Sequence, residues 1–387
     1  MILNKLLQNP IIVDTETTIS NKGQVQDLKN KLCLIQLYIP KQDKKLFFTE
    51  ENFKDVLPYL KTASCLIGFN FKFDLLWLKK VLNFTCNIPI YDVQLCEFLF
   101  SAQQWIFPSL EDVSTFYNIG HKIDKIKEYW DKGINTDEIP IEELIDYGLQ
   151  DVVLTWEITK KQISLLKTTQ KSKFLLFRLS CNDLLTLVEM EWNGLIFDEQ
   201  KAIEEAHKYE ALILNIDKEL NSILQPTIEL NYASNDDISL ILYGGSKSYQ
   251  SKIPIGVYKT GLKIGQVRNK IITTIVDFPQ LIKPLPKTEL KKQGFYSTDE
   301  PTLLSLKPNV KTKKIITLLL NRSKYKKIIG TYLLGLPKLR EKMNWPINKI
   351  YPNYNQCLTK TGRLSSSKPN AQNQPPKVKE FFISRYT

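Results

Sequence analysis

The chain has 387 residues, 43% of them hydrophobic and 24% charged, which predicts an intracellular globular protein of two or three domains. The sequence lacks an apolar run of about 18 residues, a signal-peptide layout and a Cys-x-x-Cys pair, which argues against a membrane protein, a secreted protein and a zinc site. Residues 1–245 hold 25 basic and 35 acidic side chains, whereas residues 246–387 hold 28 basic and 6 acidic ones. The acidic first part is suited to binding divalent cations, and the basic second part is suited to binding a polyanion.

The first predicted element is a short buried strand at residues 11–14, because three consecutive β-branched residues precede Asp14. Side chains two positions apart on a strand point to the same side, so Asp14 and Glu16 would stand together like two ligands of one hard cation. Taken alone, an Asp-x-Glu pair after a strand is more often a solvated strand end or a helix cap. Other parts of the chain have to decide between these interpretations.

Strand and helix signals then alternate up to about residue 165. Strands are expected at residues 32–39, 45–49 and 65–69, and the last of them leads into a helix that begins after Asn70. Asp74 lies four residues after Asn70. Both side chains can therefore face the same way from the first turns of this helix, beside the edge of the sheet.

An amphipathic helix is predicted from residue 141 onwards, because Leu144, Tyr147, Asp151 and Leu154 recur at helical spacing. An acidic side chain on the apolar face of a helix needs a cation or hydrogen-bond donors beside it. A cap or a marginal surface position explains Asp151 equally well when that residue is considered alone.

Together, the polar residues of these elements form three motifs. They are Asp14-x-Glu16 on a strand, Asn70-x3-Asp74 at a helix start and Tyr147-x3-Asp151 on a helix, and they resemble the three motifs of the DEDD exonucleases of the tyrosine subtype. The resemblance covers residues 1 to about 165 and implies a ribonuclease H-like α/β fold, a mixed sheet flanked by helices. Thr17 and Asn70 match positions that touch the terminal nucleotide in this family.

The same resemblance implies a site with two Mg²⁺ or Mn²⁺ ions, which carboxylate ligands favour. Asp14 would bridge the two ions, Glu16 and Asp151 would complete one site, and Asp74 would serve the other. One ion would lower the pKa of the attacking water and the second would stabilise the leaving 3′ oxygen. Tyr147 and Glu16 would orient that water.

The second half begins with a predicted pair of helices. The first covers about residues 171–192 and is stopped by Gly194, and Asp198 caps the second. Residues 244–298 are rich in Gly, Pro, Lys and β-branched residues, which predicts hairpins and loops. The basic tip of this insertion either grips duplex phosphate or is a solvated surface, and the sequence leaves both interpretations open.

The helical pair and the residues after it resemble the thumb and the start of the palm of phage-type family A DNA polymerases. Residues 318–339 resemble the end of the thumb helix, and residues 361–373 match the family's Thr-Gly-Arg-Leu-Ser-Ser-x-x-Pro-Asn-x-Gln-Asn segment almost letter for letter. The resemblance implies that Arg363 contacts the primer-terminal base pair. The expected DNA contacts of the second half are Arg322, Lys327, Tyr332, Thr361, Arg363, Asn370, Gln372 and Asn373.

The sequence ends at Thr387, roughly where a family A polymerase would reach its first catalytic aspartate. We therefore expect no nucleotide addition by this chain alone. Either a second chain supplies the palm and fingers, which makes the polymerase a split one, or they were lost by truncation. A split protein would need a C-terminal partner to cover the unfinished palm.

The sequence predicts an exonuclease domain at residues 1–165, a mainly helical thumb-like region at 166–345 with a β-hairpin-rich basic insertion at about 244–298, and a first palm segment at 346–387. The predicted function is a proofreading 3′-5′ exonuclease of DNA replication. It would act on single-stranded 3′ ends and on primer-template duplex, in the cytoplasm, and in a bacterial host if a phage encodes it. A free-standing RNA exonuclease of the ribonuclease D kind and a DNA-clamping subunit with an idle nuclease are the alternatives.

Overall fold

The computed structural model describes residues 2–120 and 125–384. The chain divides into two compact units, one formed by Met1–Glu199 with Leu336–Thr387 and the other by Gln200–Gly335. These units are defined by packing, whereas the boundaries predicted after residues 165 and 345 separate family domains, so those boundaries stay a prediction. Within the described part of the chain, no helix combines the length and the apolar character needed to cross a bilayer.

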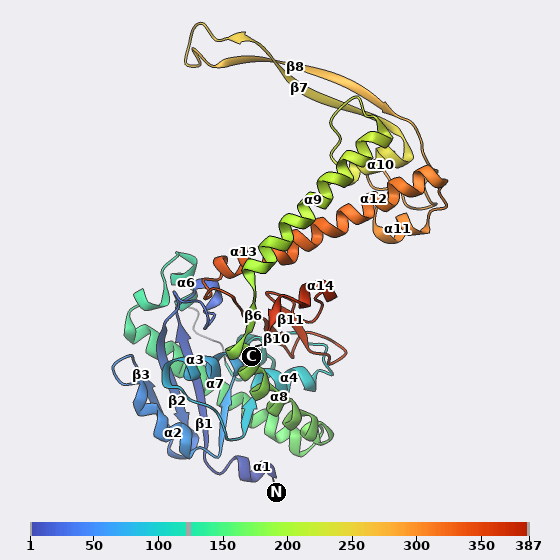
Figure 1. Ribbon diagram of the computed structural model, residues 1–387. Helices are drawn as coiled ribbons and strands as arrows, with labels where there is room; N and C mark the ends of the chain where they lie inside the picture. The colour runs from blue at the N-terminus through green and yellow to red at the C-terminus, as the bar shows by residue number, and fades with distance from the viewer. Residues whose placement is uncertain (1, 121–124, 385–387) are drawn as a thin grey trace. The chain divides into compact units, whose positions relative to one another are not determined.

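The first unit is built on a five-stranded sheet (Figure 1). Its strands are β1 (Pro10–Thr17), β2 (Leu32–Ile39), β3 (Lys44–Phe48), β4 (Cys65–Gly68) and β5 (Ile90–Asp92), in the spatial order β3-β2-β1-β4-β5. The pairs β3-β2 and β2-β1 are antiparallel, and the pairs β1-β4 and β4-β5 are parallel. The predicted mixed sheet is confirmed, and its central strand β1 carries Asp14 and Glu16.

Helices flank this sheet and bury its apolar residues. The helix α7 (Ile141–Lys167) packs on β1 and β2, and α3 (Lys72–Leu82) packs on β1 and against α8 (Phe174–Asn193). Ile11, Ile12 and Val13 are at most 1% exposed, which explains why β1 begins with a run of β-branched residues. The shorter helices are α1 (Ile2–Leu6), α2 (Leu57–Thr62), α4 (Val93–Phe100), α5 (Leu110–Phe116), α6 (Lys125–Asp131), α13 (Gly335–Lys342) and α14 (Pro376–Lys379).

Residues 336–384 fold onto the same unit as the exonuclease-like residues. They contribute to two small sheets, one with the strand order β12-β6-β9 and one formed by β10 and β11. The strands are β6 (Leu195–Phe197), β9 (Lys349–Ile350), β10 (Asn353–Asn355), β11 (Ser365–Ser367) and β12 (Phe382–Ile383). Short 3-10 turns are η1 (Ser20–Lys22), η2 (Pro40–Gln42), η3 (Phe53–Val56), η4 (Thr136–Glu138) and η5 (Lys171–Lys173).

A nearly buried ion pair ties three of these elements together. Lys72 of α3 donates to Glu191 Oε1 of α8 at 2.5 Å, and the two side chains are 14% and 7% exposed. Lys72 also donates to Asn353 Oδ1 at 3.0 Å, and the backbone N–H of Tyr354 donates to Glu191 Oε1 at 2.6 Å. Because Lys72 lies two residues before Asp74, this network fixes the start of α3 against β10.

The second unit contains two long helices and a β-hairpin. Its helices are α9 (Glu199–Leu224), α10 (Asn235–Tyr243), α11 (Glu300–Ser305) and α12 (Val310–Lys327), and α12 continues into the π-helical turn η6 (Ile328–Leu333). Arg322 of α12 is paired with Asp217 of α9, and the rings of Tyr209 and Tyr325 lie 5.1 Å apart. These contacts hold α9 and α12 side by side.

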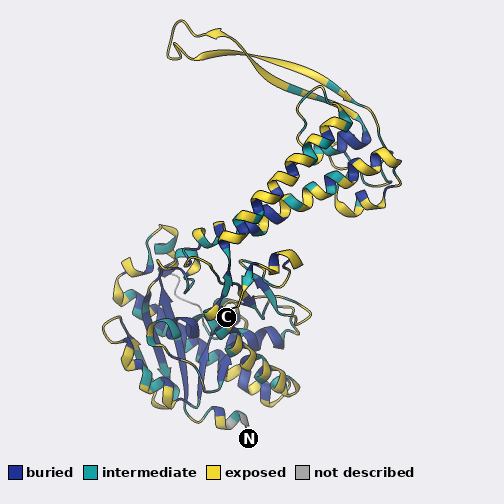
Figure 2. Ribbon diagram, viewed as in Figure 1, coloured by how far each residue is buried: buried dark blue, intermediate teal, exposed yellow. Residues whose placement is uncertain are grey.

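The insertion predicted at about 244–298 contains one long hairpin. Its strands β7 (Gly245–Val257) and β8 (Val267–Phe278) pair only with each other among the described strands. Figure 2 shows the hairpin almost wholly in the colour of exposed residues, in contrast to the sheet of the first unit. It therefore contributes little to a hydrophobic core.

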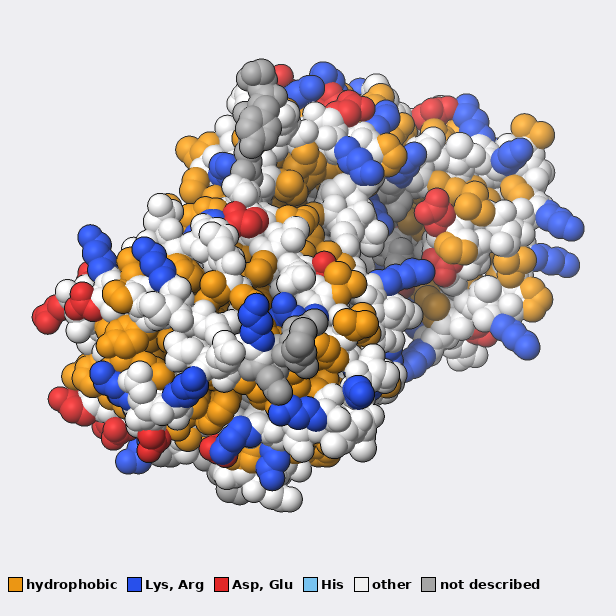
Figure 3. Space-filling model, turned by 90° about the horizontal axis from the view of Figure 1, so that it is seen from below, with side chains coloured by type: hydrophobic (Ala, Val, Ile, Leu, Met, Phe, Trp, Pro, Cys, Tyr) orange, Lys and Arg blue, Asp and Glu red, His pale blue; other side chains and the backbone are white. Residues whose placement is uncertain are grey.

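Basic, acidic and hydrophobic side chains are interspersed on the face of the molecule seen in Figure 3. The polarised charge of the sequence therefore does not appear as a single-sign patch on that face.

Candidate active site

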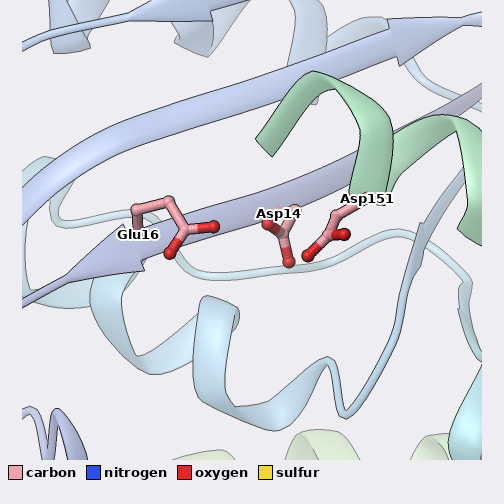
Figure 4. Close-up of side chains that lie close together, drawn as sticks. All are labelled: Asp14, Glu16 and Asp151. Carbon is pink, nitrogen blue, oxygen red and sulfur yellow. The ribbon is translucent and has the colours of Figure 1, made fainter. Parts of the chain in front are cut away.

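Three carboxylates meet where α7 crosses β1. Asp14 and Glu16 come from β1 and Asp151 comes from α7, and each offers an oxygen within 4.8 Å of the other two (Figure 4). Asp14 is partly exposed, whereas Glu16 and Asp151 are 8% and 4% exposed. The spacing of two along β1 puts Asp14 and Glu16 on the same side of the strand, and the packing of α7 on β1 adds Asp151.

Asp74 lies beside this group of three rather than within it. It stands in the first turn of α3, is 2% exposed, and accepts a hydrogen bond of 2.7 Å from the Thr15 hydroxyl. Burial and the negative charge of Asp14 raise the pKa of Asp74 well above its ordinary value. The structure thus brings all four predicted metal ligands into one neighbourhood, with Asp74 on the α3 side.

The other predicted residues of the nuclease site surround these carboxylates. Tyr147 lies one turn before Asp151 on α7, is 7% exposed, and packs its ring edge-on against Trp130 with the ring centroids 6.4 Å apart. Thr17 is 8% exposed at the end of β1, and its hydroxyl donates to the Thr18 carbonyl at 3.2 Å. Asn70 is exposed just before α3, in the left-handed region with a φ of 54°.

Two further residues shape the site, and sequence reasoning did not assign them a role. Gln36 of β2 is fully buried directly opposite Asp14 in the β1-β2 pairing. Its amide lies against Gly148 of α7, where an added Cβ would stand 1.8 Å from the Gln36 nitrogen. Only glycine lets α7 approach β2 so closely. A glycine inside the predicted amphipathic helix was the available signal.

Asp92 is a third such residue, and it positions the start of α3. Its carboxylate accepts hydrogen bonds from the backbone N–H groups of Phe71 at 2.8 Å and Leu95 at 2.9 Å, and the second of these caps α4. Burial raises the pKa of Asp92 from 3.8 to about 6 in spite of these bonds. An aspartate between a strand and a helix was visible in the sequence, but its link to α3 was not.

A polar cleft of about 410 Å³ opens beside α3, within the first unit. Asn70, Lys72 and Phe73 line one side of it, and Asn353 and Asn355 of β10 line another. The amide groups offer hydrogen-bond donors to phosphate or sugar oxygens, and the Phe73 ring offers a surface on which a base can stack.

The predicted DNA contacts of the thumb-like helix have different surroundings. Arg322 is only 14% exposed and pairs with both carboxylate oxygens of Asp217, at 2.6 and 3.2 Å. This pairing gives Arg322 a structural task within the second unit. Lys327 ends α12 with an exposed side chain, and Tyr332 is half-buried in the π-helical turn η6.

The predicted contacts of the C-terminal segment are exposed. Thr361, Arg363, Gln372 and Asn373 all have exposed side chains. Asn370 is also exposed, but its Oδ1 accepts the backbone N–H groups of Gln372 at 3.0 Å and Asn373 at 3.2 Å, which fixes the turn between them. Arg363 and Lys368 are the exposed cations of this motif.

The carboxylate group fits divalent cations. Two ionised carboxylates about 4.8 Å apart repel each other by about 3 kcal/mol at the effective dielectric constant of a partly buried site. A bound dication turns this repulsion into attraction, and oxygen ligands are those that Mg²⁺ prefers. Burial is the main cause of the raised pKa of Asp74, and the negative charge of Asp14 adds to it.

The fold and the site define a class of protein. An acidic cluster on the central strand of a mixed sheet, in a chain whose second part is strongly basic, is typical of a nuclease domain joined to a nucleic-acid-binding region. Comparison with known families agrees: residues 1–166 match the family described as 3′-5′ exonuclease, and residues 274–386 match DNA polymerase family A. These two matches confirm the predicted exonuclease domain and the predicted resemblance to the N-terminal part of family A DNA polymerases.

Individual relatives extend over most of the chain. It is 23% identical over 335 residues to the DNA polymerase of Bacillus phage SP01, a match that covers 83% of this chain and 35% of the relative. It is 24% identical over 342 residues to DNA polymerase I of Borreliella burgdorferi, covering 88% and 32%. It is 39% identical over 89 residues to DNA polymerase I of a Synechocystis strain, covering 23% and 8%. The chain thus spans about a third of the first two relatives.

A solved structure shows the same fold. The POL domain of Pol1 from M. smegmatis, in complex with a DNA primer-template and dNTP, matches with a TM-score of 0.65 and 15% identity, over 97% of this chain and 55% of that one. The likeness supports the predicted arrangement of an α/β domain followed by a mainly helical region.

Proposed function

We propose that this chain is a 3′-5′ exonuclease that removes nucleotides from DNA 3′ ends and proofreads during replication. The observation that carries the proposal is the meeting of Asp14, Glu16 and Asp151 within 4.8 Å, in residues that match the 3′-5′ exonuclease family. The proposed place of action is the cytoplasm, and it is that of a bacterial host if a phage encodes the protein.

The chemistry proposed is hydrolysis of the terminal phosphodiester. Asp14, Glu16 and Asp151 would hold one divalent ion and Asp14 and Asp74 a second, and two such ions supply a more acidic water and compensate the charge on the leaving oxygen. Glu16 and the Tyr147 phenol would orient the water toward phosphorus by hydrogen bonds.

The bonds exchanged follow from this arrangement. A bond forms between the water oxygen and the terminal phosphorus, and the bond between that phosphorus and the 3′ oxygen of the preceding nucleotide breaks. The water proton ends on that 3′ oxygen, so the products are a nucleoside 5′-monophosphate and a strand shortened by one nucleotide. Thr15 holds Asp74 in place through its 2.7 Å hydrogen bond and is a positioning residue.

The end of the strand would enter through the polar cleft beside α3. The side-chain amides of Asn70 and Asn353 can donate to phosphate or sugar oxygens, and Phe73 can stack on a base. A frayed single strand fits this use, because stacking on an aromatic ring requires an unpaired base.

A polarity assay tests the proposal. With Mg²⁺ and a 5′-labelled single-stranded DNA, the expected products are strands shortened one nucleotide at a time from the 3′ end, with release of nucleoside 5′-monophosphates. The same assay with RNA separates the ribonuclease D alternative, which predicts preference for RNA. An idle nuclease predicts no release from either substrate. Shortening from the 5′ end would refute the proposal.

The match of residues 274–386 to DNA polymerase family A supports a second proposal, that this chain takes part in primer extension together with palm and fingers residues. A mixture of the chain with a palm-and-fingers fragment of a relative should extend a primer. A mixture that extends no primer and binds primer-template no better than the fragment alone would contradict the proposal.

A further inference from the structure

The β7-β8 hairpin, called the arm below (residues 245–278), carries charge that the proposed nuclease site does not use. Between Ser246 and Val276 the sequence has 6 Lys and Arg residues and no Asp or Glu. Every residue from 250 to 275 is exposed. Acidic and basic side chains are interspersed on the face of the molecule seen in Figure 3, whereas the only acidic residue of the arm is Asp277 at its root.

The root of the arm is fixed to the second unit. Lys247 forms an ion pair with Asp237 of α10, whose side chain is 3% exposed, and its ammonium lies 4.9 Å from the Tyr249 ring centroid. The Leu242 carbonyl accepts the backbone N–H groups of Leu281 and Ile282, both at 3.0 Å. Lys247 is therefore part of the root. The five remaining cations, Lys252, Lys259, Lys263, Arg268 and Lys270, are exposed.

We propose that the arm is a two-stranded β-ribbon that lies along a groove of duplex DNA and binds about one helical turn. A two-stranded ribbon fits the width of the major groove. The 13 residues of β7 extend about 43 Å, which exceeds the roughly 34 Å of one turn of B-DNA. The arm thereby adds a duplex-binding surface that is separate from the 3′ end in the nuclease site.

The strand pairing distributes the cations over both faces of the arm. Lys252 pairs with Ile271, and Ile253, one residue further along, pairs with Lys270. Neighbouring residues on a strand point to opposite faces, so Lys252 and Lys270 lie on opposite faces. The phosphates line a groove on both of its sides, and a ribbon with cations on both faces can reach both walls.

The exposed apolar residues of the arm also suit DNA better than a protein partner. Ile253 and Ile271, 44% and 57% exposed, stand next to these cations and also lie on opposite faces. At these two positions, each face of the ribbon therefore carries one cation beside one isoleucine. The cores of protein interfaces are depleted in lysine, whereas DNA interfaces are strongly positive, and apolar side chains can contact the thymine methyl group. A second copy of the arm is a poor partner, because the five exposed cations of one arm would repel the five of the other.

The test compares duplex binding by the full chain and by a variant whose five exposed arm cations are neutral. The variant is Lys252→Gln, Lys259→Gln, Lys263→Gln, Arg268→Gln and Lys270→Gln. The control removes the same charge from exposed lysines of the first unit: Lys41→Gln, Lys44→Gln, Lys45→Gln, Lys54→Gln and Lys61→Gln. Affinity for a long blunt duplex is measured against salt concentration in EDTA, together with the hydroxyl-radical footprint on the duplex.

The proposal predicts that the slope of log affinity against log salt falls in magnitude by about 4 in the arm variant and by less than about 1 in the control. The footprint shortens by about 10 base pairs only in the arm variant. An unchanged slope and footprint in the arm variant would overturn the proposal and favour a protein partner for the arm. Equal losses in both variants would also overturn it, because they would show that only the total charge of the protein matters. Cleavage of a short single strand stays unchanged in both variants, so a failed nuclease would be seen separately.

Discussion

Replacing Asp151 by asparagine should stabilise the metal-free protein while abolishing its nuclease activity. The change keeps the shape of the side chain and removes one charge from the group formed with Asp14 and Glu16. Two repulsions of about 3 kcal/mol each disappear at the effective dielectric constant used above. The gain in stability cannot exceed about 4 kcal/mol, because the wild type can relieve the repulsion by protonating one of the three carboxylates. At pH 7 this protonation costs about 4 kcal/mol for a carboxyl of ordinary pKa. We therefore expect a gain between about 1 and 4 kcal/mol.

Urea unfolding in EDTA measures this gain, and Asp146→Asn is the matched control, because Asp146 is exposed on the same helix. The wild type should become more stable on addition of Mg²⁺, and Asp151→Asn should lose most of that increase. The reasoning is refuted if Asp151→Asn is no more stable than the control variant in EDTA, or if Mg²⁺ stabilises it as much as it stabilises the wild type.

Three other residues give sharp expectations. Gly148→Ala places a Cβ 1.8 Å from the buried side-chain nitrogen of Gln36, so α7 must shift and the nuclease rate should fall at least about 10-fold. The control is Gly330→Ala, where an added Cβ meets nothing within 4 Å, and it should leave the rate unchanged. The pKa of Asp92 rises from 3.8 to about 6 on folding, so this residue lowers the free energy of unfolding by about 3 kcal/mol as the pH rises from about 4 to 6. Urea unfolding at a series of pH values should show that Asp92→Asn lacks this decrease. Lys72→Met leaves Glu191 buried without its cation and should cost about 3 kcal/mol in urea unfolding, part of which Lys72→Met/Glu191→Gln should restore.

The parts of the site that depend on local periodicity could be predicted from the sequence. A spacing of two on a strand puts Asp14 and Glu16 on one side, and helical spacing puts Asp151 on the apolar face of α7. Each of these residues remained ambiguous alone. The three motifs resolved the ambiguity through their order and spacing, because chemistry at a metal site requires several carboxylates at once.

The parts that depend on tertiary pairing could not be predicted. Gln36 meets Gly148 only because β2 pairs with β1 in one particular register, which places Gln36 opposite Asp14. Arg322 was expected to contact DNA, but it forms an ion pair with Asp217. The two residues are more than a hundred positions apart in the sequence, and only the packing of α9 against α12 brings them together. Side-chain periodicity carries no information about either contact.

The sequence also predicted the boundaries of some elements poorly, because local composition obscured their periodicity. Residues 318–339 were expected to resemble the end of the thumb helix, and no start was predicted for that helix. The helix α12 begins at Val310, where the Asn309 side chain accepts the backbone N–H of Thr312 at 2.9 Å as a cap. Lysines dominate the first turns of this helix, so its apolar pattern starts late. In the arm, the same composition was compatible with several short hairpins or with the single long one that forms.

The most direct test of the proposed function is nucleotide release from single-stranded DNA by the wild type and by Asp14→Ala/Glu16→Ala. Glu50→Ala/Glu51→Ala removes the same charge from an exposed site and is the control. With Mg²⁺, the wild type and the control should release nucleoside 5′-monophosphates at similar rates, and Asp14→Ala/Glu16→Ala should be slower by at least about 100-fold. Equal release by the wild type and Asp14→Ala/Glu16→Ala would contradict the assignment of the nuclease site to these carboxylates.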